Sequence, residues 1–103
     1  MEEMQISESY LADFRGYLRI TSKAQDGEIK DCINAARGSL IRGGVLPERA
    51  KDENDPLVKK AISNYVKAEF GLDNPDSEKY RAAFAEQKAD LAMASEYIEA
   101  EEG

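Results

Sequence analysis

The residues of this sequence that could do chemistry are acids, lysines and one cysteine, because the chain contains no histidine. Histidine is the usual general base near neutral pH and the commonest metal ligand, so its absence removes the most frequent catalytic and metal-binding arrangements. Cys32 has no histidine to activate it and is a poor nucleophile candidate. Its position on the apolar stripe of a predicted helix favours a small buried hydrophobic residue instead.

The acidic residues form no recognisable metal site. An EF-hand loop that began at Asp73 would need glycine and glutamate where the chain has Glu78 and Phe84. The acids between 52 and 55 are interpreted as a solvated loop and a helix cap. Gly43-Gly44 lacks the Lys-Ser or Lys-Thr of a phosphate-binding loop. A pair of carboxylates for acid–base catalysis stays an open alternative among the 21 acids, but no pair stands out. We expect no enzyme, no catalytic residue, no cofactor and no metal.

Two sets of basic residues are candidates for binding. Lys59, Lys60 and Lys67 share one flank of a predicted helix, where they could bind phosphate, although a solvated helix face is the more usual reason for such a flank. Four arginines on the first two predicted helices could form ion pairs between subunits or simply keep the surface soluble; they are Arg15, Arg19, Arg37 and Arg42.

Composition narrows the class of protein. A chain of 103 residues is expected to form one domain, 1–103. Its net charge of -7 argues against a free-standing binder of DNA or of anionic membranes. The lone cysteine excludes an intrachain disulfide, no apolar run is long enough to span a membrane, and the acidic start is unlike a signal peptide. We therefore expect a soluble cytosolic protein.

The element that must position these residues is a helix predicted over 55–71. Asp55 suits the N-cap, Pro56 the first helical position and Gly71 the closing residue. Apolar residues fill about half of its circumference at 100° per residue, with Ser63 and the three lysines on the other side. This helix should cross the middle of a small all-helical domain. Its apolar residues are Leu57, Val58, Ala61, Ile62, Tyr65 and Val66.

Two further helices are predicted before it. The first begins at Ser7 as N-cap, and the second runs over about 26–40 with a narrow apolar stripe that includes Ile33. The segment 41–54 is the longest irregular stretch and the one place where a short hairpin is conceivable. Loops of this length in compact domains are usually functional or disordered, so we expect it to contact a partner through Arg42, Leu46 and Arg49.

The last predicted helix runs from Asp76 or Ser77 to about Ile98 and has two non-polar faces. One is a stripe of large residues for the core, which includes Phe84 and Leu91. The other could contact a second subunit, or it could reflect alanine's helix propensity on a solvated surface. An acidic tail follows. The fold class is all-α, with four helices and a long loop between the second and third. The small face consists of Ala82, Ala85, Ala89, Ala92 and Met93.

Three stretches together resemble the phage head-tail connector family, the head completion or adaptor proteins of tailed phages and prophages. They are 6–20, which ends in Gly-Tyr-Leu-Arg-Ile; 29–40, with its central Ala-Ala; and 55–62 with 80–98, which ends in Ser-Glu-Tyr-Ile. Helical leucine and alanine patterns are common, so the ordered set carries the resemblance.

The resemblance implies a virion protein, found in the host cytoplasm during assembly, that forms a ring of about a dozen copies beneath the portal protein. The ring would extend the DNA channel, pass DNA during packaging without specific binding, and offer a docking surface to the tail or to a second connector. It implies no catalytic residues and no membrane. The acidic tail departs from the family and leaves open whether this end docks on the portal.

Two other classes stay open. A small helical regulatory module of phage origin, such as an antirepressor or adaptor, would form a stable complex with one partner. A helix-turn-helix DNA binder ranks third, because the second helix mixes Lys30, Arg37 and Arg42 with three acids. Stoichiometry separates the ring from the regulatory module.

Overall fold

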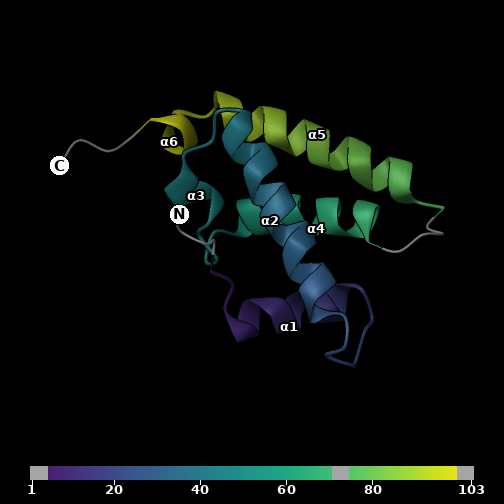
Figure 1. Cartoon of the computed structure of the whole chain (residues 1–103). Helices are drawn as coiled ribbons and strands as arrows, with labels where there is room; N and C mark the ends of the chain where they lie inside the picture. Colours follow the sequence, from purple (N-terminus) through teal and green to yellow (C-terminus); the bar gives the residue numbers. More distant parts are fainter. Residues whose placement is uncertain (1–4, 71–74, 100–103) are drawn as a thin grey trace.

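The computed structural model describes residues 5–70 and 75–99, and these residues form helices joined by turns (Figure 1). The all-α prediction is confirmed, and the four longer helices correspond to the four expected. Two single-turn helices, α3 and α6, were not predicted. The helices are α1 (Glu8–Tyr17), α2 (Asp26–Arg42), α3 (Pro47–Ala50), α4 (Pro56–Glu69), α5 (Ser77–Met93) and α6 (Ser95–Ile98).

Helix α4 has the central position that its sequence predicted, because it packs against α1, α2 and α5. Its start follows the expected cap: the Asp55 carboxylate accepts hydrogen bonds from the backbone N–H groups of Leu57 (2.9 Å) and Val58 (3.1 Å). Its last residue is Glu69, while Gly71, the predicted closing residue, lies outside the described residues.

The buried arc of α4 is rotated from the predicted one. Leu57 is 59% exposed although it was assigned to the apolar side, and Ser63 is buried although it was assigned to the wet side. Ser63 can be buried at little cost because its hydroxyl donates to the Lys60 carbonyl at 2.7 Å. Asn64 is also buried, and its amide donates to the Gln87 side chain at 2.8 Å.

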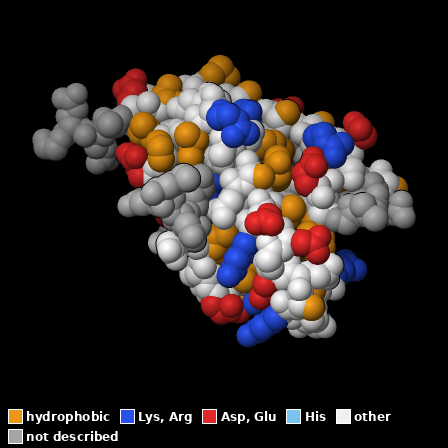
Figure 2. All heavy atoms as spheres, in the orientation of Figure 1, with side chains coloured by type: hydrophobic (Ala, Val, Ile, Leu, Met, Phe, Trp, Pro, Cys, Tyr) orange, Lys and Arg blue, Asp and Glu red, His pale blue; other side chains and the backbone are white. Residues whose placement is uncertain are grey.

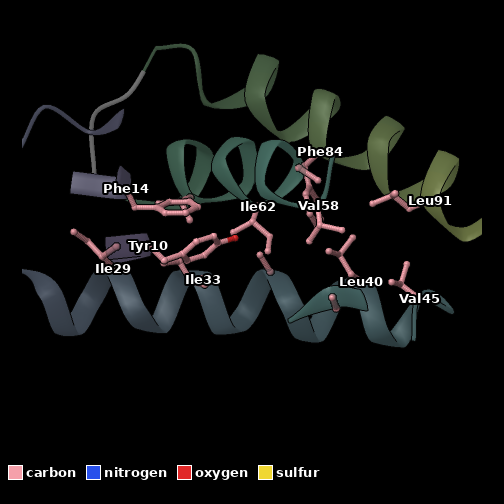
Figure 3. Packing of buried hydrophobic residues seen from close by; sticks show 14 of the residues in the cluster. Tyr10, Phe14, Ile29, Ile33, Leu40, Val45, Val58, Ile62, Phe84 and Leu91 are labelled. Carbon is pink, nitrogen blue, oxygen red and sulfur yellow. The ribbon is translucent and has the colours of Figure 1, made fainter. Parts of the chain in front are cut away.

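The core lies along α4, between α2 on one side and α5 on the other (Figure 3). Phe14 of α1 and Ile33 of α2 are fully buried against it. Phe84 of α5 meets the Tyr65 ring edge-on, with 5.0 Å between the ring centroids. Cys32 is half-buried, less than its predicted place in the stripe implied.

The last helix ends earlier than predicted. Ala94 adopts an extended conformation (ψ 119°), which ends α5 at Met93 and lets α6 begin at Ser95. Tyr97 of α6 is buried, and its hydroxyl donates to the Asp55 carboxylate at 2.8 Å. The carbonyl of Tyr97 accepts from the Leu46 N–H at 2.8 Å. These bonds hold α6 against α3 and the start of α4.

Tyr97→Phe is expected to lower the free energy of unfolding at pH 7 by about 1 kcal/mol, because it removes the hydrogen bond from the Tyr97 hydroxyl to Asp55. Burial, and then the bond to Asp55, raise the pKa of Tyr97 from 10 to about 12. A raised folded-state pKa contributes stability that is complete below pH 10 and is lost as pH rises toward 12. Urea unfolding at pH 7 and between pH 10 and 12 should therefore show a smaller alkaline loss in the variant. Equal losses would contradict the Tyr97–Asp55 contact.

The segment 41–54 is more ordered than predicted, and within it the chain forms the helical turn α3 and no hairpin. Val45 and Ala50 are buried in the core, which accounts for much of this order. The backbone at Gly44 has φ 116°, a conformation that glycine adopts without strain.

A buried arginine ties the start of the described chain to this segment. Arg37 is fully buried, its Nη1 donates to the Gln5 carbonyl at 2.9 Å, and its Nη2 lies 3.7 Å from the Glu53 carboxylate. The Glu53 carboxylate also accepts from the backbone N–H and the hydroxyl of Ser7, the N-cap of α1. Glu53 therefore belongs to a structural cluster, which corrects its assignment to a solvated loop.

Two of the four arginines proposed for ion pairs between subunits are already used within the chain. Arg37 is buried, and Arg15 donates to Glu8 (2.6 Å) and to Asp26 (2.8 Å). The pKa values of both carboxyl groups are lowered, chiefly because Arg15 donates these hydrogen bonds. Arg19 and Arg42 remain exposed.

Glu53→Gln is expected to lower the free energy of unfolding by about 1 to 2 kcal/mol, because the amide keeps the shape but leaves the buried Arg37 charge without its counter-charge. Urea denaturation at pH 7 measures the loss. Glu48→Gln is the matched control, since Glu48 is exposed on α3 and should change stability by less than about 0.5 kcal/mol. Equal stability of the two variants would show that Glu53 does not balance Arg37.

Candidate assembly surfaces

The small face predicted for the last helix lies at the surface of the described structure. Ala82, Ala85 and Ala89 are exposed, Met93 is 75% exposed, and Ala92 is half-buried. These five residues, called here the alanine stripe, lie on the side of α5 away from the buried residues that face α4. Figure 2 shows hydrophobic side chains at the surface along this edge of the molecule, with charged side chains between them.

The other predicted contact residues gather near the end of this stripe. Arg42 is exposed at the end of α2, which α5 approaches closely enough for Lys88 to donate to the Ser39 hydroxyl at 3.0 Å. Leu46 and Arg49 are half-buried beside α6. The structure therefore brings Arg42, Leu46 and Arg49 to the same end of the molecule as Met93, while Ala82 and Ala85 lie farther along α5.

A hollow lies along one flank of α4. It has a volume of about 540 Å³, and we call it the lysine hollow. Sequence periodicity placed the three lysines together but missed the aromatic rings from α1 and α5, because they come from distant segments. Its lining residues are Tyr17, Pro56, Lys59, Lys60, Ser63, Asn64, Lys67 and Tyr80.

The three lysines of this hollow differ in their surroundings. Lys59 pairs with Asp13 at 2.5 Å, and its pKa is raised, chiefly by this hydrogen bond. The Lys67 ammonium lies over the rings of Tyr17 (5.6 Å) and Tyr80 (5.5 Å). Such cation–π contacts help to hold the lysine in place. Lys60 is exposed, so the hollow presents at least one readily accessible cation.

Groups that could support a reaction are scarce in the described residues. No three histidine, cysteine or acidic side chains lie close enough there to hold a metal ion. Burial raises the pKa of the Cys32 thiol, which lowers its thiolate fraction and its reactivity. Among the described helices, none has the length and apolar character to cross a membrane.

A family model described as phage connector protein matches residues 11–98. The chain belongs to the phage connector protein family. Searches against curated proteins and against solved structures gave no significant match. The resemblance seen in the sequence is confirmed at the level of the family. A connector of this family is a structural protein associated with the virion, and it interacts with other proteins of the phage particle.

The matched range of this connector contains both surfaces described above. It begins within α1 and ends with α6, so it includes the alanine stripe and every residue that lines the lysine hollow. It leaves out the acidic tail, of which residues 100–103 also lie outside the described residues.

Proposed function

We propose that this connector is a head completion subunit that forms a closed ring of about a dozen copies beneath the portal protein. The ring extends the DNA channel and gives the tail, or a second connector, a surface to bind. Membership in the connector family over residues 11–98 carries the proposal. The connector acts in the virion and, during assembly, in the host cytoplasm.

The alanine stripe supports assembly into a ring. A ring of identical subunits needs two different complementary patches on each subunit. Small side chains allow the backbone of a neighbouring helix to approach closely, and the exposed Met93 adds apolar area at one end of the stripe. Arg42, Leu46 and Arg49, beside the Met93 end of the stripe, are the candidates for the second patch.

The charge of the chain supports passage of DNA without specific binding. Proteins that hold DNA neutralise phosphates with lysine and arginine and release counterions. A subunit with a net charge of -7 gives a ring that repels the duplex, which suits a channel. This role requires no catalytic residue, cofactor or metal, and it involves no membrane.

The experiment that tests this function mixes the connector with the portal protein of the same phage and images the complexes by electron microscopy. The proposal predicts portal particles that carry an added ring of connector density on one face. Bare portals at saturating connector would contradict it. A stable dimer that binds one other protein would instead favour the small regulatory module.

A further inference from the structure

Two large apolar side chains at the surface, Leu57 of α4 and Met93 of α5, have no role in the core. They are the two most exposed of the large hydrophobic residues that the structure describes. Single exposed apolar residues are common in proteins, so the argument depends on where these two lie. Methionine is also enriched at protein interfaces relative to the rest of the surface.

Leu57 lines a small groove between α4 and α5, called here the leucine groove. The buried Leu91 lines it from the α5 side. Its volume of about 190 Å³ is below the range of about 300 to 1,000 Å³ that is usual for sites of small-molecule ligands. The groove is therefore suited to a single apolar side chain. Its lining residues are Leu57, Lys60, Gln87, Asp90 and Leu91.

Met93 projects from the side of α5 away from Leu91. The two residues are about 200° apart around the helix at 100° per residue. A helix with its side chains is about 10 to 12 Å across, so one neighbouring molecule can contact Met93 while another fills the groove. A protruding side chain and a groove on different sides of one subunit form a head-to-tail contact, which repeats from copy to copy.

The charges beside the two features are complementary. Glu86 is exposed seven residues before Met93, almost two helical turns, so both lie on the same side of α5 about 10 Å apart. On α4, Lys60 and Lys67 lie three and ten residues beyond Leu57, and both line the lysine hollow. A neighbouring α5 that lies along α4 with Met93 over the leucine groove can therefore place Glu86 between two lysines.

We propose that Met93 of each subunit inserts into the leucine groove of the neighbouring subunit, with Glu86 beside Lys60 and Lys67 of that neighbour. This inference rests on the proposed ring and deepens it, because it adds the groove to the candidates for the second patch and names what fills it. The alanine stripe ends at Met93, so the stripe and the groove are the two surfaces of one contact. Methionine suits this role because its unbranched side chain adapts to an irregular space.

Disulfide trapping tests the contact in a chain whose own cysteine is removed by Cys32→Ala. One sample carries Leu57→Cys and the other Met93→Cys; both positions are exposed, so the subunits should stay folded. The two are mixed and oxidised mildly where the unmodified protein assembles, in solution or on the portal protein. We expect a dimer that joins the two different chains. Each chain has one cysteine, so no bond can form within a chain.

Lys30→Cys is the matched control, because Lys30 is exposed on α2 and lies outside the groove. Mixed with Leu57→Cys, it should give at least about tenfold less product, since a disulfide requires close approach of the two Cβ atoms. Equal yields from the two mixtures would overturn the inference. So would bonds that mainly join two Leu57→Cys chains or two Met93→Cys chains, because contacts between like positions are isologous.

A charge exchange gives a second, independent measurement. Leu57→Asp and Met93→Lys should each weaken assembly by about tenfold, because each places a charge in an apolar contact. An acid in the first turn of a helix and a base in the last turn suit the helix dipole, so folding should be kept. Both changes in one chain should restore part of the assembly, since each contact then pairs opposite charges. Losses that simply add in the double variant would contradict a direct contact.

Further results separate this contact from the proposed ring. Rings of the subunit without the mixed disulfide would overturn the contact and leave the ring intact. Loss of portal binding in Leu57→Asp with unchanged self-assembly would assign the groove to the portal protein and also overturn the inference. A mixed disulfide in a protein that sediments only as a dimer would show a reciprocal contact, which contradicts the ring and leaves the groove as the site of Met93.

Discussion

Arginine in place of Ala89 is expected to abolish self-assembly of the connector while the subunit stays folded. Ala89 is exposed in the middle of the alanine stripe, so a solvated arginine there should change the free energy of unfolding by less than about 0.5 kcal/mol. In a packed helix contact the same side chain would be too large, and its charge would be buried without a partner.

Sedimentation velocity and thermal unfolding of the same samples separate an effect of Ala89→Arg on assembly from an effect on folding. Ala12→Arg is the matched control, because Ala12 is an exposed alanine on α1, away from the stripe. We expect the control to assemble normally and to melt at the same temperature as Ala89→Arg. Normal assembly of Ala89→Arg would remove the alanine stripe from the set of interfaces.

Phe84→Ala is expected to have the largest effect on stability, a loss of about 3 to 5 kcal/mol in the free energy of unfolding. The Phe84 side chain is only 7% exposed and meets the Tyr65 ring at 5.0 Å, in the contact that joins α5 to α4. Truncation leaves a cavity in that contact and removes the ring pair.

Urea denaturation at pH 7 measures this loss. Leu57→Ala, at an apolar position of α4 that is 59% exposed, is the comparison and should cost less than about 1 kcal/mol. A loss below about 1 kcal/mol in Phe84→Ala would mean that the inner face of α5 is assigned to the wrong residues.

Local signals predicted most of the fold. Asp55 and Ser7 act as N-caps where the sequence placed them, because a short polar side chain before an apolar-periodic run satisfies the first free N–H groups of a helix. The spacing of Phe84 and Leu91 correctly placed both in the core. These features depend on residues close together in the chain, so the sequence alone was sufficient for them.

Features that depend on distant partners could not be predicted in this way. Arg37 was assigned to the surface because arginine is mostly exposed, and only the fold brings Gln5 and Glu53 to it. The end of α5 at Met93 also involves a residue that is distant in the sequence. Periodicity continues past Ala94, but Tyr97 bonds to Asp55, 42 residues away in sequence, and this contact accompanies the turn into α6.

For the candidate surfaces too, features set by nearby residues could be predicted, and features set by distant residues could not. The alanine stripe and the three lysines of α4 follow from helical spacing, and the structure places both sets at the surface or in the hollow. The rings that complete the lysine hollow come from α1 and α5, far from α4 in sequence. Helix spacing alone gives no signal for such a site.

The central claim is that this connector assembles into a closed ring, and its most direct test is a mass measurement. Sedimentation velocity from micromolar to near-millimolar protein, alone and with the portal protein of the same phage, gives the size of each complex. The ring predicts one discrete species of about a dozen subunits, formed in solution at high concentration or on the portal. A chain that remains monomeric in both conditions, or a dimer that grows no further, would contradict it.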